Sequence, residues 1–491
     1  MLRRTTLVVT AITAMVLSTA QGAQAHGGGF TPGASGVGDA YYPLDGNGGY
    51  DVRHYDLDVK YTPATDVLAG TATISARATQ NLSAFNLDFE GLTIRSLTVD
   101  GTPARYARNG GELTITPRHG LPKGRSFTVV VRYDGVPQTI DDPNLGRTGV
   151  FHTDDGMVIA GQPDVAATWY PVNDHPLDKA TYTIKVTVPE GLEAVANGAL
   201  IGSRTRHGWT TWTWDAAEPM ASYLVTANVG EFDLHAYKVD GIRYWDAVDP
   251  DLTETGERVF IDKAFARHPE INGFLADNFG RYPFRTSGGI VDDMEGLYFA
   301  LETQTRPIYS KYFFTDQSSA DNVVVHELAH QWYGDSLAVA RWQDIWLNEG
   351  FATYAEWLWA EHEGRATPQQ LFDANYQAIP ADDPFWQLTI GDPGPVRLFD
   401  YPIYLRGAMT LQVLRNRVGD DAFFRIIKGW ATTRAGGNVT TPQFIAYAER
   451  VSGRQLDDLF DTWLYTATRP VVETSAARTA LPGPAAPTLR K

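Results

Sequence analysis

The segment His326-Glu327-Leu328-Ala329-His330 carries the strongest chemical pattern in the sequence. Two histidines four residues apart lie on the same face of a helix, so both imidazoles can bind one metal ion. Glu327 is set off from that axis, where its carboxylate can take a proton from a metal-bound water. The pattern arises by chance in on the order of one per cent of chains with this histidine content. It therefore predicts a metal site on a helix, which Ser318 or Ser319 can cap.

A catalytic zinc site needs a third protein ligand and leaves the fourth position for water. Glu349 follows His330 after eighteen intervening residues and opens a second helical run that reaches about Glu363. A carboxylate at the start of a helix packed against the first helix can complete a His-His-Glu site. The same residue also fits a solvated carboxylate near a helix N-terminus, which the helix dipole favours. Spacing alone leaves both interpretations open.

The composition excludes several other kinds of site. The chain has 491 residues and no cysteine, which excludes disulfides, a thiolate nucleophile and cysteine-ligated metals. Its formal charge is −17, from 41 Lys and Arg against 58 Asp and Glu, which argues against binding to nucleic acid. Hydrophobic residues make up 43% of the chain, as in an ordinary globular protein. Any metal must therefore be held by His, Asp or Glu.

The elements that must position these residues fall into two regions of different periodicity. Residues 50–238 contain short alternating runs, such as 55–61, separated by turn pairs such as Asp100-Gly101. This pattern predicts an all-β, sandwich-like N-terminal domain.

Helical periodicity then takes over, and residues 239–470 are predicted to form a mainly helical domain with extended segments around 288–305. Thr367-Pro368 and Thr441-Pro442 each place a cap residue before a proline at a helix start. The predicted fold class is a multidomain α and β protein.

Both ends of the chain have a composition of their own. Residues 1–25 have the positive start, short apolar run and small-x-small site of a cleaved secretory signal peptide. The apolar run is shorter than the ~20 residues that a membrane span needs. Residues 26–49 are predicted to be a flexible Gly-rich lead, and 471–491 a disordered Ala/Pro-rich tail. We therefore expect a secreted, extracellular protein with no membrane association after signal cleavage.

The histidine motif, the eighteen-residue spacing and the segment Asn348-Glu349-Gly350-Phe351-Ala352 closely resemble the zinc aminopeptidases of the aminopeptidase N family. These proteins are gluzincins with a thermolysin-like catalytic domain. The resemblance implies one zinc ion per chain, held by His326, His330 and Glu349, with Glu327 as the general base. It covers about residues 50–470. We expect a short member of the family, without the C-terminal helical domain of longer members.

The family's exopeptidase signature Gly-x-Met-Glu-Asn, whose Glu binds the substrate α-amine, is absent from the sequence. Its best counterpart is Phe299-Ala300-Leu301-Glu302-Thr303, because Glu302 lies 24 residues before His326, a spacing that matches the leukotriene-hydrolysing branch. The rival segment Met294-Glu295-Gly296 lies seven residues earlier. The resemblance implies that Glu302 binds the amine, and the alternative is an ordinary carboxylate on an edge strand.

A segment of the β-rich half also resembles the family. Gly161-Gln162-Pro163-Asp164 is similar to the part that dips from the N-terminal domain into the active site. Asp164 falls where family members often have a Glu or Gln that contacts the substrate amine, and it could instead cap a turn after Pro163. Together, Glu302 and Asp164 would hold an ammonium group by charge-assisted hydrogen bonds.

Tyr404-Leu405-Arg406-Gly407-Ala408 is similar to the family's Tyr-x-Lys-Gly-Ala, with Arg406 in place of the lysine. The resemblance implies that Tyr404 donates a hydrogen bond to the oxyanion that forms from the peptide carbonyl. Tyr401 is the weaker candidate for this role. A buried structural tyrosine is the alternative for both.

Together these observations predict a zinc-dependent aminopeptidase, that is, a metallopeptidase that acts on peptide substrates. We expect it to be a monomer. One alternative is a secreted zinc endopeptidase, because the exopeptidase signature is degraded. A non-catalytic zinc-containing binding protein is the other alternative, and the presence of Glu327 and Tyr404 argues against it. The acidic loop around Asp292 fits a solvated surface, with calcium binding or selection of basic substrates as alternatives.

Overall fold

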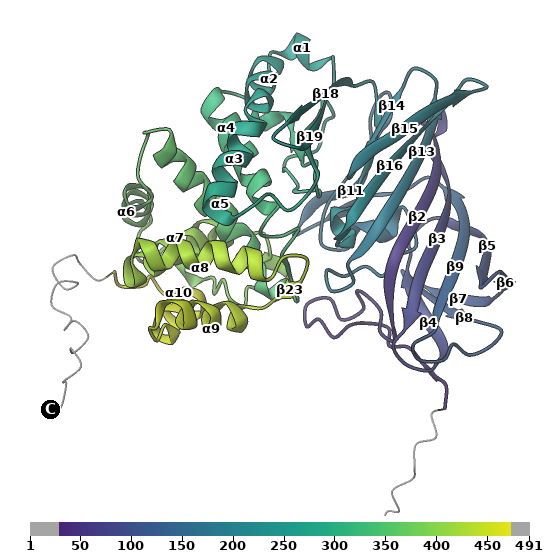
Figure 1. Cartoon of the computed structure of the whole chain (residues 1–491), viewed down its shortest axis with the longest axis horizontal. Coiled ribbons are helices and arrows are strands. Elements are labelled where there is room, and N and C mark those ends of the chain that lie inside the picture. Colours follow the sequence, from purple (N-terminus) through teal and green to yellow (C-terminus); the bar gives the residue numbers. More distant parts are fainter. Residues whose placement is uncertain (1–28, 473–491) are drawn as a thin grey trace, which may run out of the picture.

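The computed structural model of the chain describes residues 29–472. The predicted signal peptide, 1–25, and nearly all of the predicted tail, 471–491, lie outside the described residues. Strands gather on one side of the molecule and helices on the other, in the order of the sequence (Figure 1). The predicted fold class, a β-rich N-terminal half followed by a mainly helical half, is confirmed. None of the helices in the described part of the chain is long and apolar enough to cross a membrane.

The largest sheet of the β-rich half has eight strands. In spatial order they are β15 (Ala199–Arg206), β16 (Trp209–Met220), β13 (Ala180–Pro189), β2 (Tyr50–Thr62), β3 (Val67–Ala78), β9 (Ser126–Gly135), β5 (Thr93–Val99) and β6 (Thr102–Pro103). Alternation explains the sheet, because β13 buries every second side chain, from Ala180 to Val188. Strands β13 and β2 pair in parallel, whereas β2, β3 and β9 pair antiparallel.

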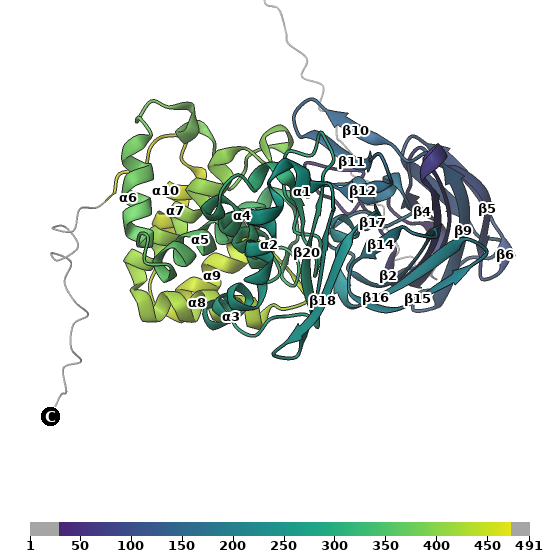
Figure 2. The same cartoon turned by 90° about the horizontal axis from the view of Figure 1, so that it is seen from above.

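Two smaller sheets complete this half. One has four strands: β1 (Thr31–Pro32), β4 (Leu82–Asp88), β8 (Glu112–Thr116) and β7 (Arg105–Asn109). The other has five: β10 (Thr139–Asp142), β11 (Gly146–His152), β12 (Met157–Ala160), β17 (Ala227–Gly230) and β14 (Glu193–Ala196). Figure 2 shows this five-stranded sheet on the side of the β-rich half that faces the helices.

A four-stranded sheet opens the second half. Its order is β18 (Asp233–Val239), β19 (Ile242–Val248), β20 (Thr286–Asp292) and β21 (Ile308–Ser310). Strand β18 pairs antiparallel with β19, and β19, β20 and β21 are parallel. Strand pairing therefore assigns the chain from Asp233 onward to the second half, whereas periodicity placed the change after residue 238. A two-stranded pair, β22 (Ala338–Val339) with β23 (Asn438–Val439), lies among the helices.

The helices of this half are α1 (Leu252–Thr255), α2 (Arg258–Ala266), α3 (His268–Phe279), α4 (Gln317–His330), α5 (Trp346–His362), α6 (Pro368–Ala378), α7 (Tyr401–Val418), α8 (Asp420–Thr433), α9 (Thr441–Ser452) and α10 (Asp457–Tyr465). Helix α4 packs on α5, and α5 packs on α7. Asp316 caps α4 by accepting hydrogen bonds from the backbone N–H groups of Ser318 and Ser319, so the serines expected as caps are the donors. Thr440, rather than Thr441, forms the capping box of α9.

Helices α5 and α7 touch through two glycines. A Cβ added at Gly407 would lie 2.7 Å from the Cα of Gly350, and one added at Gly350 would lie 2.9 Å from the Cα of Gly407. Real carbon contacts are longer, so any side chain at either position would push the two helices apart. Gly350 directly follows Glu349, and Gly407 lies three residues after Tyr404. This crossing therefore sets the distance between two of the predicted site residues.

The side chain of Arg406 links α7 to the C-terminal part of the helical half. It is fully buried and donates hydrogen bonds to the carbonyl oxygens of Trp386, Leu388, Trp463, Thr462 and Thr466. Arginine has five N–H donors in a planar fork, whereas lysine has three on one nitrogen. Arg406, where the family pattern has lysine, therefore has a structural role, because its guanidinium joins α7 to α10.

The Gly-rich segment within 29–49 packs against both halves, in contrast to the flexible lead that its composition predicted. Asp39 is buried and accepts hydrogen bonds from the backbone N–H of Trp342 and from His175 Nε2, at 3.0 and 3.3 Å. The glycines permit close backbone contacts here, because a Cβ on Gly36 would lie 2.1 Å from the carbonyl oxygen of Pro43. Tight turns, rather than flexibility, account for the glycine content.

Replacing Gly407 with alanine should destabilise the protein, since its methyl group would force α5 and α7 apart. Overpacking of this kind costs about 1–3 kcal/mol, which a fall in the midpoint of thermal unfolding would report. Gly273→Ala in α3 is the matched control, because nothing lies within 4 Å of a Cβ there. That control should be neutral or slightly stabilising, owing to the better helix propensity of alanine. Equal melting midpoints for the two variants would contradict the steric role of Gly407.

Candidate metal centre and substrate pocket

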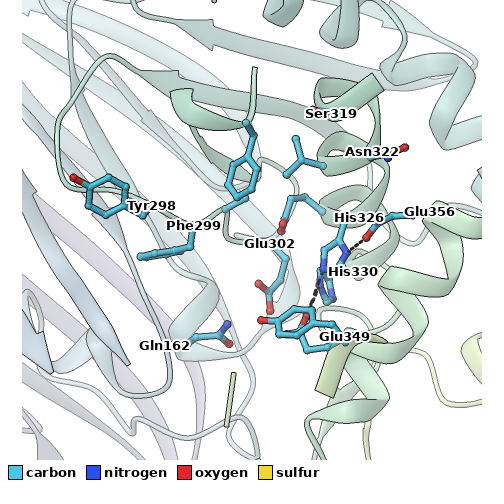
Figure 3. A pocket seen from close by; sticks show the side chains of 15 residues that line it. Gln162, Tyr298, Phe299, Glu302, Ser319, Asn322, His326, His330, Glu349 and Glu356 are labelled. Atoms are coloured by element: carbon cyan, nitrogen blue, oxygen red, sulfur yellow. Dashed lines mark hydrogen bonds and ion pairs between the residues drawn. The ribbon is translucent and has the colours of Figure 1, made fainter. Parts of the chain in front are cut away.

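The three predicted ligands converge on one point. His326 and His330 project from the last turns of α4, and Glu349 projects from the first turn of α5. Glu349 Oε2 lies 3.4 Å from His326 Nε2 and 3.3 Å from His330 Nε2. Figure 3 shows the two imidazoles beside Glu349, with the cavity in front of them.

These separations suit a tetrahedral ion. Zinc bonds to nitrogen and oxygen are about 2.0–2.1 Å long, and a tetrahedral angle then places two ligand atoms about 3.3–3.4 Å apart. The observed distances from Glu349 Oε2 to the two imidazole nitrogens fall in that range. Three protein ligands leave one tetrahedral position for water or substrate. The donor set and its geometry therefore fit a zinc ion.

The outer nitrogen of each histidine is already engaged. His326 Nδ1 lies 2.7 Å from Glu356 Oε1, and His330 Nδ1 lies 2.9 Å from the carbonyl oxygen of Tyr333. When both Nδ1 atoms donate their proton to these acceptors, the Nε2 lone pairs are left free for a metal. Sequence reasoning missed Glu356. The available signal was its position seven residues after Glu349, two turns along the same face of α5.

Buried carboxylates and imidazoles shift one another's ionisation. Burial opposes the charged form of Glu349, but the charge of His330 and hydrogen bonds from both imidazoles lower the pKa of Glu349 to about 2. Burial likewise disfavours the charged form of His330, yet Glu349 and Glu302 raise the pKa of His330 to about 9. The cluster is thus rich in negative charge and needs a cation, either as imidazolium or as a metal ion.

Glu327, the predicted general base, lies close to the predicted metal ligand His330. Its side chain is buried, and Oε2 has no hydrogen-bond partner among the described residues. Burial raises the pKa of Glu327 to about 8, an effect that Glu302 and Glu349 add to and the two histidines oppose. A carboxylate in this state can both accept and release a proton near neutral pH.

Glu302 lies at the same point from another direction. It follows β20 in the loop that leads to β21, and Glu302, Glu327 and His330 each offer an atom within 4.8 Å of the others. Tyr223 of the β-rich half donates a hydrogen bond to Glu302 Oε1 at 3.1 Å. The rival Glu295 does not line the cavity. It is exposed and accepts hydrogen bonds from Lys311 and Tyr312.

The β-rich half also holds the loop that carries Glu302. Asn197 donates a side-chain hydrogen bond to the carbonyl oxygen of Gln304 at 2.9 Å. Arg306 donates to the carbonyl oxygen of Gly198 at 3.1 Å, and the N–H of Gly198 donates to Thr305 Oγ1 at 2.8 Å. The turn between β14 and β15 therefore fixes the residues immediately after Glu302.

A cavity of about 440 Å³ opens onto this cluster. It is lined by Gln162, Tyr298, Phe299, Ala300, Glu302, Phe313, Ser319, Asn322, Val323, His326, Glu327, His330, Glu349, Glu356 and Tyr404. Tyr298 and Phe299 lie on the side away from the histidines, and Gln162 faces Glu302 from the β-rich half (Figure 3). The arrangement combines an apolar pocket with carboxylates at its metal end.

The structure does not bring Asp164 to this cavity. Gln162 lines it instead, while Asp164 is exposed and precedes a 3-10 helix (Val165–Thr168). The charge of Asp164 acts on Asp45 and Tyr42, so its carboxylate faces the segment 29–49. Gln162, rather than the predicted Asp164, therefore lines the cavity, because the chain turns between these two residues.

Tyr404 lies on α7 and lines the cavity, with its ring stacked 6.0 Å from that of His326. Burial raises the pKa of Tyr404 well above its ordinary value, and the nearby Glu349, Glu302 and Glu327 add to the effect, so the phenol keeps its proton. Tyr401, one turn earlier on α7, is 63% exposed and does not line the cavity. The structure thus places Tyr404, rather than Tyr401, beside the metal ligands.

Comparison with known protein families gives two matches, and both are domains of the peptidase M1 family. Residues 52–224 match the Peptidase M1 N-terminal domain, and residues 294–463 match the Peptidase family M1 domain. Among curated relatives, the chain is 25% identical over 467 residues to glutamyl aminopeptidase of Homo sapiens, covering 87% of this chain and 47% of that protein. It is 26% identical over 451 residues to aminopeptidase N of Lactococcus lactis, covering 86% and 51%. The chain therefore spans about half the length of the curated relatives it matches.

In contrast, the match to related solved structures covers nearly the whole length of the solved chain. An M1 zinc metallopeptidase from Deinococcus radiodurans is 28% identical, with a TM-score of 0.78, and the match covers 89% of this chain and 98% of that one. A mutant of the protein from the same organism, bound to a Tyr-Ser-Ala substrate, matches with a TM-score of 0.77 over 89% and 99% of the two chains.

Removing the carboxylate behind His326 should weaken metal binding. The variant Glu356→Gln keeps the size of the side chain but loses the charge that orients the imidazole and increases its basicity. Loss of such a partner typically lowers metal affinity about 10–100-fold. Competition for zinc against a chromogenic chelator measures the change. Glu361→Gln, an exposed site on the same helix, is the control and should leave the affinity unchanged. Equal affinities for both variants would rule out this role of Glu356.

Proposed function

The chain belongs to the peptidase M1 family, and from this premise we propose that it is a zinc aminopeptidase that removes N-terminal residues from peptides. One observation carries the proposal. The carboxylate of Glu302 lies beside Glu327 and His330, at the metal end of a cavity of about 440 Å³. A carboxylate in that place can bind a free α-amine and leave the first peptide bond close to the metal ligands.

His326, His330 and Glu349 would hold one zinc ion per chain. When bound, zinc supplies a Lewis acid that polarises the peptide carbonyl and makes water more acidic. Glu327 takes the proton from the attacking water and delivers it to the leaving amine. Its carboxylate is buried, and burial raises the pKa of Glu327 above that of an ordinary glutamate, which makes it a better proton acceptor.

Selection for a free amine would come from Glu302, with Gln162 opposite it. An ammonium ion can form a charge-assisted hydrogen bond with the Glu302 carboxylate, which Tyr223 orients from the other side. The side-chain oxygen of Gln162 adds a neutral acceptor. A peptide bound in this way presents its N-terminal residue to the cavity, and the remaining chain points outward.

Tyr404 would stabilise the transition state. Its phenol is protonated and lies next to the metal ligands, so it can donate a hydrogen bond to the oxygen that becomes negative as water attacks. One preorganised donor of this kind is typically worth about 3–4 kcal/mol. Peptides are the proposed substrates, and a monomer is the proposed state.

Amine recognition is tested with matched substrates. A dipeptide with a free N-terminus should be cleaved, and its N-acetylated form should be cleaved poorly or not at all. In Glu302→Gln the preference for the free amine should fall by about tenfold or more, because a charge-assisted hydrogen bond contributes about 1.5–3 kcal/mol. Tyr404→Phe is the comparison variant. It should lower kcat about 10²–10³-fold without changing the preference.

Cleavage of free and acetylated peptides at equal rates would refute the exopeptidase proposal and favour an endopeptidase. Activity that survives a zinc chelator would refute the metal requirement. A zinc-loaded protein that cleaves no member of a broad peptide library would favour a binding protein instead.

We also propose that the protein is exported, on the strength of the signal-peptide pattern in residues 1–25. Signal cleavage after Ala25 would leave His26 as the first residue of the mature chain. Expression of the full chain in its own host, followed by N-terminal mass spectrometry of the culture medium, tests this. Recovery of uncleaved protein from the cells alone would argue against export.

A further inference from the structure

Three carboxylates meet outside the substrate cavity, at one edge of the sheet β18–β21. Asp249 directly follows β19, and Asp292 and Asp293 stand at the end of β20. Strands β19 and β20 are parallel, with Val248 paired to Val291, so both strands end at the same edge. The three side chains each offer an oxygen that lies within 4.8 Å of the others. Topology therefore brings the carboxylates together from positions over forty residues apart.

One oxygen in this cluster has no partner. Asp292 is only 3% exposed, and its Oδ1 accepts a hydrogen bond from the N–H of Met294 at 2.9 Å. Its Oδ2 is buried and has no hydrogen-bond partner among the described residues. An unpaired buried carboxylate oxygen is costly, and here its nearest charged neighbours are also carboxylates. A cation bound between them would remove both penalties.

Lys311, which lies near the cluster, forms its ion pair with another residue. Lys311 Nζ pairs with Glu295 at 2.9 Å and donates a hydrogen bond to the backbone carbonyl of Asp293. Within residues 29–472 no ion pair joins Lys311 to the carboxylates of Asp249, Asp292 or Asp293. Asp249 and Asp292, the two buried members, therefore lack the lysine or arginine partner that buried carboxylates usually have, whereas the charge of Lys311 acts on the half-buried Asp293.

A second acidic group provides a contrast. Glu270, His362 and Glu363 also gather within 4.8 Å, but they are exposed. Arg267 pairs with Glu270 at 2.9 Å and with Glu363 at 2.8 Å, so each carboxylate of that group already has a cationic partner. Burial and the missing cation distinguish the cluster at β19 and β20.

The β-rich half adds further negative charge at this edge. Asp155 lies in the turn between β11 and β12, and both of its oxygens are engaged, by the Thr153 hydroxyl and the N–H of Glu231. Burial raises the pKa of Asp292 well above its ordinary value, and the charges of Asp249 and Asp155 add to the rise. Asp155 thus contributes to the field around the cluster while its own oxygens are occupied.

We propose that Asp249, Asp292 and Asp293 bind one Ca²⁺ ion, which joins the ends of β19 and β20. Three carboxylates form an all-oxygen donor set, which suits hard divalent cations. Backbone N–H groups of Asp251 and Met294 hold two of the carboxylates, so the chain, rather than the ion, sets the positions of the ligands. Calcium accepts such irregular geometry with six to eight oxygens, whereas magnesium requires a near-ideal octahedron.

Bound calcium would also fix the start of the segment 293–301. That segment runs from the end of β20 to Glu302 and contributes Tyr298, Phe299 and Ala300 to the cavity. Figure 2 shows β20 within the helical half, near its boundary with the five-stranded sheet. The binding site itself does not depend on the proposed peptidase activity.

Calorimetric titration of calcium-free, zinc-loaded protein with CaCl₂ tests the proposal directly. One ion per chain should bind, with a Kd of about 10⁻⁴ to 10⁻³ M, as in extracellular calcium modules. Saturating calcium should raise Tm by about 2–5 °C, and MgCl₂ should raise it less. Amide hydrogen exchange in residues 293–301 should slow when calcium binds. None of these measurements requires the protein to cleave a peptide.

Asp292→Asn should weaken calcium binding at least tenfold. Its Tm without calcium should equal or exceed that of the natural protein, because a repulsive charge is lost, and this shows that the variant folds. Asp249→Asn serves the same purpose through a different strand. Glu363→Gln, in the group paired with Arg267, is the control and should bind calcium normally. Three outcomes would overturn the proposal. The natural protein could fail to bind calcium at about 10 mM, well above the Kd of such modules. It could respond equally to magnesium, or Asp292→Asn could leave the calcium affinity unchanged.

Discussion

One carboxylate oxygen lies 3.3–3.4 Å from each of two imidazole nitrogens, and the rest of the catalytic half is arranged around that triangle. The nitrogens come from α4 and the oxygen from α5, so the triangle exists only if the two helices keep a fixed separation. The contact between Gly350 and Gly407 extends the same constraint to α7, which carries Tyr404. Arg406, bonded to five carbonyl groups, then ties α7 to the end of the fold. Helix packing therefore sets the positions of the metal ligands and of the proposed oxyanion donor together.

Charge imposes the second condition. Glu302, Glu327 and Glu349 are all buried beside two histidines, which is stable only with compensating positive charge. The fold supplies hydrogen-bond partners from both halves: Tyr223 donates to Glu302, and Glu356 stands behind His326 as an orienting acceptor. Lys179 of the β-rich half makes a related contact, donating to the carbonyl oxygens of Asp335 and Ser336 just after α4. The β-rich half is thus a structural part of the site.

Local patterns were sufficient for much of the fold and the site. The four-residue spacing of His326 and His330, the capping box at Thr367 and the alternation in β13 depend on near neighbours, and all appear in the structure. Other features depend on distant partners and were missed or wrong. The cap of α4 is Asp316, the segment 29–49 packs against Trp342, and Gln162 replaces Asp164 at the cavity. No local pattern predicts which of two residues in a turn will face a pocket built by the other half of the chain.

The sequence by itself determined which residue types are available for chemistry and which can lie on one helix face, because helical and strand periodicity follow from backbone geometry. It also excluded cysteine chemistry, since the chain has no cysteine. Only the tertiary structure decided that Glu349 completes the triangle, that Glu302 rather than Glu295 reaches it, and that Glu356 stands behind His326. The carboxylates at the ends of β19 and β20 likewise meet only because two parallel strands end at one edge. The physical reason is the same in each case: these contacts join residues far apart in the chain, and their distances are set by packing, not by spacing in the sequence.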